Sequence, residues 1–356
     1  MSRIRAFLEL AIHQGGSDLH LATGHPPRIR IHGALHRIRF RELTDTDMQQ
    51  ILAEFMPPHM VGSLHERLSV DFAYQCEGLG RFRVNAYYHI GGLAVVLRAI
   101  PSKVATLESL GMPASIQRAI AKPSGLTLVT GPTGSGKSTT LAAMLDHLNT
   151  TRRGHIITLE DPIEFVHEYK QCVVTQREIG AHSPSFAEAL RNALREDPDV
   201  VLVGEMRDLE TISLALTAAE TGIQVMGSLH TNGAARTIDR IVNVFPSGRQ
   251  EQVRNMLAEC LNLIVSQQLV RNIEGNGRLA VAEVLLNNQA AATLIRTGRA
   301  HQLASVIQAG ARAGMQSLDA QLMELVRSQT ITGQEAYHHA IEKGRFEHLL
   351  AHDEAA

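Results

Sequence analysis

The sequence predicts an α/β protein with two domains: a small α+β domain, then a larger domain with a mostly parallel sheet and a helical C-terminal tail. Three observations lead to this prediction. The chain has 356 residues, which corresponds to about two domains at roughly 150 residues each. Before residue 100, short patterns of helix and strand type are mixed, whereas after residue 125 short apolar runs alternate with longer helical patterns. After residue 245 the pattern becomes almost wholly helical.

Composition and charge exclude several classes of protein. Hydrophobic residues make up 44% of the chain, enough for more than one core, so a disordered chain is excluded. Lys and Arg number 34 against 36 Asp and Glu, a balance that does not favour a protein whose main role is to coat nucleic acid. No apolar run approaches the ~18 residues of a membrane span, and the N-terminus is too polar for a signal peptide. We therefore expect a soluble, cytoplasmic protein.

The three cysteines, Cys76, Cys172 and Cys260, are widely separated and form no Cys-x-x-Cys pair. This spacing supports neither a disulfide framework nor a four-thiolate zinc site. We expect three buried thiols in a reducing compartment.

The first domain is predicted to span residues 1–100 and to contain a helix and a β-hairpin. Residues 46–49 form a candidate capping box, and apolar residues follow at helical spacing until Pro57 ends the helix. Residues 81–88 alternate between apolar and polar types, as a half-buried strand does. A Gly-Gly pair then turns the chain into the apolar run 93–97, which completes the hairpin.

Residues 101–124 contain three prolines and one short helical pattern, which predicts a linker to a second domain at 125–356. Short apolar runs predict the strands of that domain, at 126–129, 156–159, 200–203 and 225–229. Helical patterns lie between these runs, near 138–148, 185–195 and 209–220. This alternation predicts a mostly parallel sheet that is covered by helices on both faces.

Beyond residue 245 we expect mainly helices, interrupted by one more strand at 279–286. The helical expectation rests on an apolar stripe formed by Val253, Met256, Leu257, Cys260, Leu261 and Ile264.

A glycine-rich phosphate loop is the strongest chemical signal in the sequence. Residues 131–138, GPTGSGKS, follow an apolar strand and precede a helical pattern, which is the context that this motif requires. Its backbone N–H groups can surround phosphates, Lys137 can neutralise the β and γ oxygens, and Ser138 can hold Mg²⁺. The predicted nucleotide-binding residues are Gly131, Pro132, Thr133, Gly134, Ser135, Gly136, Lys137, Ser138 and Thr139.

Two other predicted strands end in carboxylates, where a nucleotide's metal ion would need them. One leads into the acidic cluster 160–164, and the other leads through Gly204 into Glu205. The second strand resembles a Walker B strand, but Gly204 stands where a metal-orienting Asp is usual, so acidic groups must come from Glu205 or the 160–164 cluster. A third strand ends at His230, which can either bond the γ-phosphate or a nearby carboxylate, or serve a structural role.

Three arginines of the first domain, Arg81, Arg83 and Arg98, lie on or near the predicted hairpin. Their spacing alone favours a solvated strand face. The functional alternative is a set of arginine fingers that reach the nucleotide of a neighbouring subunit.

Four sequence blocks together resemble the secretion-type ATPases, the hexameric motors of type II secretion and type IV pili. They are GPTGSGKSTT at 131–140, ITLEDPIEF at 157–165, LREDPDVVLVGEMRDLET at 194–211 and GSLHTN at 227–232. Glycine at position 204 is usual for this family. Residues 17–21 resemble the opening of the family's PAS-like domain, so the resemblance implies a PAS-like domain followed by a RecA-like ATPase core.

The resemblance also implies a mechanism and partners. Glu164 would polarise the attacking water, Glu205 would organise Mg²⁺ through its waters, and arginines of the PAS-like domain would reach the neighbouring site. The implied cofactors are ATP and Mg²⁺, and the implied assembly is a homo-hexamer at the inner membrane, peripheral to it at the pilus base. A PilC-like platform protein and the accessory ATPase PilU are the implied partners, and nucleic acid is not.

The subtype is inferred from absences and from the C-terminal stretch. Extension and secretion members usually carry an extra N-terminal domain and a tetracysteine zinc module, and neither is expected here. Residues 314–319 resemble the pilus-retraction members, whereas 292–297 keep only the helical core of a motif of that branch. We therefore expect a retraction motor that drives pilus disassembly and twitching motility. The alternatives are an accessory retraction ATPase, an extension or secretion ATPase, and a RecA-like nucleic-acid translocase.

Overall fold

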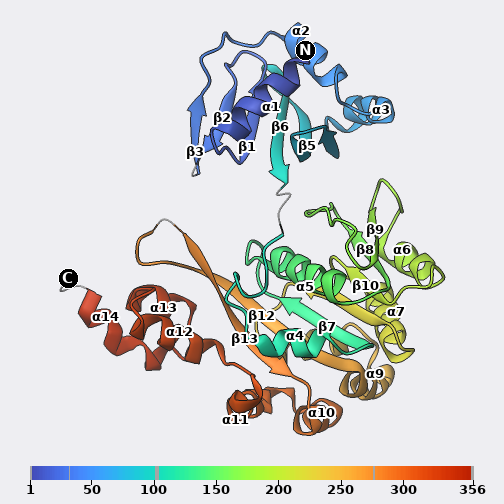
Figure 1. Ribbon diagram of the computed structural model, residues 1–356, viewed down its shortest axis with the longest axis vertical. Helices are drawn as coiled ribbons and strands as arrows, with labels where there is room; N and C mark the ends of the chain where they lie inside the picture. Colours follow the sequence, from blue (N-terminus) through green and yellow to red (C-terminus); the bar gives the residue numbers. More distant parts are fainter. Residues whose placement is uncertain (1, 32, 101–103, 276, 354–356) are drawn as a thin grey trace. The chain divides into compact units, whose positions relative to one another are not determined.

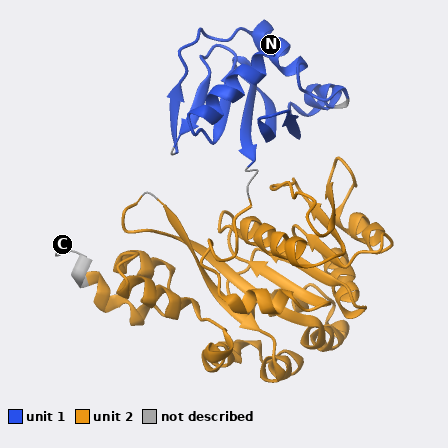
Figure 2. Cartoon of the chain, in the orientation of Figure 1, with its two compact units in different colours: residues 1–103 blue, residues 104–356 orange. Residues whose placement is uncertain are grey.

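The computed structural model describes residues 2–31, 33–100, 104–275 and 277–353 of the chain. The chain divides into two units, residues 1–103 and residues 104–356 (Figure 2). The smaller unit mixes helices with an antiparallel sheet, and the larger one contains a mostly parallel sheet with helices (Figure 1). The predicted α/β fold, with a smaller N-terminal domain followed by a domain built on a mostly parallel sheet, is therefore confirmed, whereas the PAS-like assignment stays a prediction.

The N-terminal unit is built on a six-stranded sheet with the order β3-β2-β1-β6-β5-β4 and antiparallel neighbours. Its strands are β1 (Asp18–Ala22), β2 (Arg28–Ile31), β3 (Ala34–Arg37), β4 (Ser69–Cys76), β5 (Gly80–His89) and β6 (Gly92–Ile100). Its helices are α1 (Arg3–His13), α2 (Asp45–Ala53) and α3 (Pro58–Arg67). The apolar faces of α1 and α2 pack with one face of the sheet in a single core. The predicted helix and the β5–β6 hairpin are both present.

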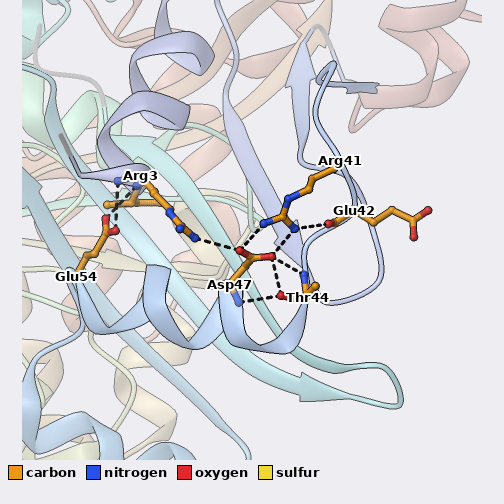
Figure 3. Close-up of polar contacts among 7 residues, drawn as sticks. Arg3, Arg41, Glu42, Thr44, Asp47 and Glu54 are labelled. Atoms are coloured by element: carbon orange, nitrogen blue, oxygen red, sulfur yellow. Dashed lines mark hydrogen bonds and ion pairs between the residues drawn. The ribbon is translucent and has the colours of Figure 1, made fainter.

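The N-terminal cap of α2 differs from the expected one. The cap is Thr44, whose Oγ1 accepts a hydrogen bond from the N–H of Asp47 at 3.2 Å, while Asp47 accepts from the N–H of Thr44 at 2.9 Å. Both Thr44 and Thr46 fit the capping pattern in sequence. Asp47 is the third residue of the helix, and Arg3 and Arg41 both donate to its carboxylate, at 2.6 to 3.0 Å (Figure 3).

The Asp47 cluster predicts an acid-sensitive N-terminal unit. The hydrogen bonds from Arg41 and Thr44 hold the pKa of Asp47 well below its usual range. Its charged form therefore stabilises the fold above the unfolded pKa of about 3.9, and this contribution is lost as the pH falls towards the lower folded pKa. We expect Asp47→Asn to lower the melting temperature of the full chain at pH 7, and the deficit to shrink below about pH 4.

A melting series from pH 7 to pH 3 checks this expectation. Asp45→Asn is the matched control, because Asp45 is in the same helical turn and its exposed carboxylate accepts from Gln49 alone among the side-chain contacts described. An equal deficit for Asp47→Asn at pH 3 and pH 7 would refute the assignment of its stabilising role to the charge.

The larger unit contains a seven-stranded sheet with the order β13-β12-β7-β11-β10-β8-β9. Every neighbouring pair from β12 to β9 is parallel, and β13 runs antiparallel to β12 at the other edge. The strands are β7 (Gly125–Thr130), β8 (His155–Glu160), β9 (Val173–Glu178), β10 (Val200–Val203), β11 (Gln224–Leu229), β12 (Leu261–Arg271) and β13 (Arg278–Leu286).

Helices cover both faces of this sheet, as predicted. On one face α4 (Ala114–Ile120) and α5 (Lys137–Thr151) pack against side chains such as Val129 and Val200. The other face, with residues such as Leu128 and Val201, packs against another set of helices. This set comprises α6 (Phe186–Ala193), α7 (Leu209–Glu220), α8 (Ala234–Asn243), α9 (Ser247–Cys260), α10 (Gln289–Arg296) and α11 (Leu303–Ala309).

The C-terminal tail is helical and packs on β12 and β13. It comprises α12 (Leu318–Arg327), α13 (Gly333–His339) and α14 (Glu347–Asp353), with short 3₁₀ turns at Ala300–Gln302, Ala311–Ala313 and Lys343–Arg345 in the same half of the unit. Leu322 and Phe346 are fully buried against Val270 and Val281 of the two strands.

The structure corrects two expectations about secondary structure. The helical stripe ends at Cys260, and Leu261 and Ile264 belong to β12. That strand is buried between β7 and β13, so its residues are apolar without alternation, and such a run resembles the end of a helical stripe. β9 was not predicted, because this edge strand carries mostly polar residues after Val174.

The expected linker, 101–124, also differs in the structure. Residues 101–103 lie outside the described residues, and residues 104–124 belong to the larger unit. Leu107, Ile116 and Ile120 are buried there, against the same face of the sheet as α5. Of the prolines in the described part, Pro113 is the N-cap of α4 and Pro123 lies in the bend before β7, so both stand at turns in a packed segment.

Candidate functional site

The phosphate loop joins the end of β7 to the start of α5, as predicted. Gly131 has φ 144°, and a Cβ there would lie 2.1 Å from the carbonyl oxygen of Gln267, so only glycine fits. The loop is also held from β12, because Gln267 Nε2 donates to the carbonyl oxygen of Ser135 at 2.7 Å. Thr140 Oγ1 donates to Gln267 Oε1 at 2.7 Å and fixes that side chain.

Gln267 was not among the predicted site residues, although it is 2% exposed and braces the loop. It lies 132 residues after Ser135, on a strand whose pattern was partly taken for helix. No local sequence signal links the two positions.

Lys137 is buried at the start of α5, and its ammonium group is held by the loop. Nζ donates to the carbonyl oxygens of Gly131 and Pro132, both at 3.0 Å. Burial lowers the pKa of Lys137, and the carboxylates of Glu205 and Glu164 oppose that shift. The loop and two acidic side chains thus keep a positive charge beside the helix N-terminus, where phosphates bind in proteins of this type.

The acidic cluster 160–164 contains Glu160, Asp161 and Glu164, and the first and last of these carboxylates have different surroundings. Glu160 is half-buried and accepts from Thr158 Oγ1 at 2.6 Å and from Gln176 Nε2 at 3.2 Å. Burial raises the pKa of Glu160, which the two hydrogen bonds partly offset. Glu164 is exposed, and within the described residues its carboxylate accepts no hydrogen bond. Both side chains line the same cavity, but the Glu160 carboxylate is already hydrogen-bonded within the protein, whereas that of Glu164 remains available to a ligand or water.

Glu205 and His230 meet at the ends of neighbouring strands. His230 Nε2 lies 3.1 Å from Glu205 Oε1, and Arg207 Nη2 donates to Glu205 Oε2 at 2.6 Å. Burial raises the pKa of Glu205, but the hydrogen bond from Arg207 and the nearby His230 outweigh it, so the pKa is lowered. Glu205 is therefore a carboxylate at neutral pH. Arg207 was not predicted, although it lies two positions after Glu205.

The structure gives a steric reason for glycine at position 204, where a metal-orienting Asp is usual in a Walker B strand. A Cβ at this position would lie 3.0 Å from the carbonyl oxygen of Leu159 and 3.3 Å from Cα of Glu160. The N–H of Gly204 donates to the same Leu159 oxygen at 2.7 Å. The two acidic strand ends are thus in direct backbone contact.

One cavity of about 180 Å³ brings together residues of the phosphate loop, the acidic strand ends and His230. The predicted residues that line it are Thr133, Gly134, Lys137, Ser138, Glu164, Glu205 and His230. Gly136 and Thr139 line a neighbouring hollow with Gln267 and Leu269. The remaining loop residues contribute carbonyl oxygens that accept hydrogen bonds, as described for Gly131, Pro132 and Ser135.

The three predicted arginines all lie in the N-terminal unit. Arg81 and Arg83 are on β5, and Arg98 is on β6 directly opposite Arg83. Arg98 Nε donates to Oδ1 of the buried Asp18 at 2.8 Å, whereas Arg83 lies 3.8 Å from the exposed Asp71. The Arg83 and Arg98 side chains are 46% and 67% exposed, which agrees with a solvated strand face.

Other site classes find little support in the part of the chain that the structure describes. There, no three His, Cys, Asp or Glu side chains cluster as metal ligands, and no helix is both long and apolar enough to cross a bilayer. Cys76, Cys172 and Cys260 are free and buried, as expected from their spacing.

The parallel sheet, the phosphate loop and the acidic strand ends beside it define an ATPase of the phosphate-loop class. Comparison with known proteins agrees: the model of the family described as type II/IV secretion system protein matches residues 1–338, so the chain belongs to this family.

Individual relatives are similar to this chain over most of its length. The chain is 50% identical over 333 residues to the type IV pilus retraction ATPase PilT of Pseudomonas aeruginosa, covering 94% of this chain and 96% of the relative. It is 40% identical over 333 residues to the type IV pilus ATPase PilU of the same organism, covering 94% and 87%. A crystal structure of the pilus retraction motor PilT with bound ADP superposes with a TM-score of 0.92 at 43% identity, covering 98% and 99%.

Proposed function

We propose that this chain is a hexameric, ATP-hydrolysing motor that powers type IV pilus retraction, and with it twitching motility, by driving pilus disassembly. The observation that carries the proposal is 50% identity to PilT over nearly the whole of both chains. The lower identity to PilU, 40% over the same length, makes an accessory retraction ATPase the second candidate.

ATP and Mg²⁺ are the proposed cofactors, and the cavity has the donors that they require. Ser138 and Glu205 both line it and offer a hydroxyl and a carboxylate. Mg²⁺ prefers oxygen ligands and keeps several waters, so two protein groups together with phosphate oxygens are a sufficient set. Bound there, the ion would neutralise charge on the phosphates. Lys137 would bind the β and γ oxygens, while His230 would hold Glu205 in place and sense the γ-phosphate.

Glu164 is the proposed base that orients the attacking water, because its carboxylate lines the cavity without a described hydrogen bond, whereas Glu205 is held by Arg207 and His230. We expect Glu164→Gln to bind ATP normally and to lower kcat by on the order of 100-fold or more, since only the positioned charge is lost. Phosphate release and nucleotide binding, measured on the same preparation, check this.

The matched control is Glu168→Gln, which removes an exposed carboxylate from the same segment but outside the cavity. It should hydrolyse ATP at the parent rate. Normal turnover by Glu164→Gln would place the base elsewhere, with Glu205 as the next candidate.

Arg81, Arg83 and Arg98 are proposed to act in trans, on the nucleotide of the neighbouring subunit in a homo-hexamer. Arg83 and Arg98 are exposed, which leaves their guanidinium groups accessible to such a partner, whereas Arg81 is half-buried; arginine donors match phosphate geometry. Each ATP must favour one arrangement of the units over another for hydrolysis to perform work, since equal affinity for both would shift nothing.

The proposed place of action is the cytoplasmic side of the inner membrane, peripheral to it at the pilus base. There the chain would act on an inner-membrane platform protein of the PilC type, together with PilU. No role for nucleic acid is proposed, because the balanced charge favours none.

Deletion of the gene in its host tests the retraction function directly. Excess surface pili together with lost twitching would support it, whereas cells without pili would show an extension ATPase. Unchanged retraction force and speed in the presence of a second retraction ATPase would indicate an accessory role. Stimulation of ATP turnover by nucleic acid, falling steeply with salt, would favour a translocase.

A further inference from the structure

Two buried side chains, one on β12 and one on β13, form hydrogen bonds with the backbone that follows His230. The loop that carries His230 leads from β11 into α8, whose N-cap is Gly233, a residue without a side chain that could cap the helix. Ser266 Oγ on β12 accepts a hydrogen bond from the N–H of Gly233 at 2.7 Å. Glu283 Oε1 on β13 accepts one from the N–H of Ala234, also at 2.7 Å. Two helix-start N–H groups, which no helix can satisfy internally, thus bond to residues far along the chain.

Glu283 is an ionisable residue in a buried position, where a carboxyl group is unfavourable unless it is paired. It is 9% exposed and lies on a strand whose other inward residues are apolar. Burial raises the pKa of Glu283, the bond from the Ala234 N–H opposes this, and the charge of Asp319 adds to it. An unpaired buried carboxyl would destabilise the fold, whereas the partial positive charge of a helix N-terminus favours one. Glu283 therefore stabilises the start of α8 through its hydrogen bond with the Ala234 N–H.

Further hydrogen bonds join the residues after His230 to the first turn of α8. Thr237 Oγ1, in the first turn of α8, donates to the carbonyl oxygen of Gly233 at 2.8 Å and lies 2.8 Å from Thr231 Oγ1. His230 precedes this tied segment, and its Nε2 reaches Glu205 at 3.1 Å. A shift at the start of α8 would therefore move His230 relative to Glu205.

We propose that Glu283, assisted by Ser266, is a positioning residue for ATP hydrolysis: it fixes the turn after His230 so that the imidazole keeps its place beside Glu205. The inference rests on the proposed role of His230 in the site. Glu283 touches neither the nucleotide cavity nor its lining side chains; it acts through the backbone of the loop.

A double-mutant cycle on the full chain tests the inference. We expect Glu283→Ala to lower kcat about tenfold or more, with KM for ATP within about twofold, because misplacing a catalytic group by a fraction of an ångström affects the chemical step. Glu283→Gln keeps an acceptor for the Ala234 N–H and should retain most of the parent kcat. In a His230→Ala background, Glu283→Ala should lower kcat no further, because its target is already absent.

Asp319→Ala is the matched control. Asp319 is also a buried carboxylate that accepts from backbone N–H groups, those of Ile341 and Glu342, and it lines the same small cavity of about 60 Å³ as Glu283. It makes no described contact with the His230 loop. Its loss should lower the melting temperature and leave kcat per folded molecule unchanged.

The results separate this inference from the role of His230. If His230→Ala retains the parent kcat, the role of His230 fails and the inference fails with it. If His230→Ala is slow while Glu283→Ala is not, the inference alone is overturned. It is also overturned if the two effects multiply in the double variant, or if Asp319→Ala lowers kcat as much as Glu283→Ala does. If Glu283→Ala does not fold, Ser266→Ala in the parent and His230→Ala backgrounds decides by the same cycle, because it removes the acceptor of the Gly233 N–H.

Discussion

Replacing Lys137 with alanine should lower ATP turnover by at least about 100-fold while leaving the chain folded. Lys137 Nζ is held by the carbonyl oxygens of Gly131 and Pro132 at the start of α5, and burial already disfavours its charge. The buried ammonium is stabilised when negative charge builds up on a bound phosphate group in the transition state. The variant therefore loses stabilisation of the transition state more than stability of the fold. Phosphate release over time, beside a melting curve, measures both.

Lys170→Ala serves as the control for this variant. It removes the same group from an ion pair with Asp146 on α5, 2.7 Å away and outside the cavity. Its turnover should match that of the parent chain. A Lys137→Ala variant within a few-fold of the parent would contradict the site as described.

The second large effect is expected at the arginines of the N-terminal unit. Arginine fingers of other phosphate-loop enzymes contribute on the order of 10³–10⁵ in rate, and a shared set gives less per residue. Arg83→Ala is the clearest variant, because Arg83 makes only a 3.8 Å contact with an exposed carboxylate, so stability should change by no more than about 0.5 kcal/mol. Arg98→Ala is less clean, since it also removes a hydrogen bond from the buried Asp18.

Mixing two inactive variants tests whether the arginine acts across subunits. Arg83→Ala with an intact phosphate loop, combined with Lys137→Ala with intact arginines, should regain part of the turnover, because one subunit supplies the site and its neighbour supplies the arginine. Arg37→Ala, an exposed arginine of the edge strand β3, is the control and should be fully active alone. No recovery in mixed rings that are shown to have formed would mean that Arg83 acts within its own subunit or faces solvent.

The parts of the structure that were predictable depend on neighbouring residues in the sequence. The phosphate loop, the parallel strands and the acidic strand ends each follow from a local motif or a period of apolar residues, and parallel strands bring their carboxyl ends to one edge. This is why Glu205 and His230 could be expected near Lys137. The contact between Glu205 and His230 is consistent with that expectation, although the sequence alone left a structural role for His230 open.

The parts that were missed depend on residues far apart in the chain. Gln267 braces a loop 132 residues earlier, and Glu283 caps a helix 49 residues earlier. Neither belongs to a pattern that can be recognised without the fold. β12 was mistaken for helix because a strand buried on both sides has no alternation, and the segment 104–124 was mistaken for a linker because its prolines obscured the buried Leu107 and Ile116.

The contact between Gly204 and Leu159 limits how this site can diverge. Because a Cβ at position 204 would lie 3.0 Å from the Leu159 oxygen, a side chain there requires the backbone of β8 or β10 to shift by a few tenths of an ångström. An aspartate at this position would therefore strain the contact between the two strands, whereas changes at 205 or in the 160–164 loop would not meet this obstacle. The same contact joins the ends of β10 and β8, because the N–H of Gly204 donates to the Leu159 oxygen at 2.7 Å. The segment that carries Glu205 and the segment that begins at Glu160 therefore share one backbone attachment, and a substitution that disturbs it affects both acidic strand ends.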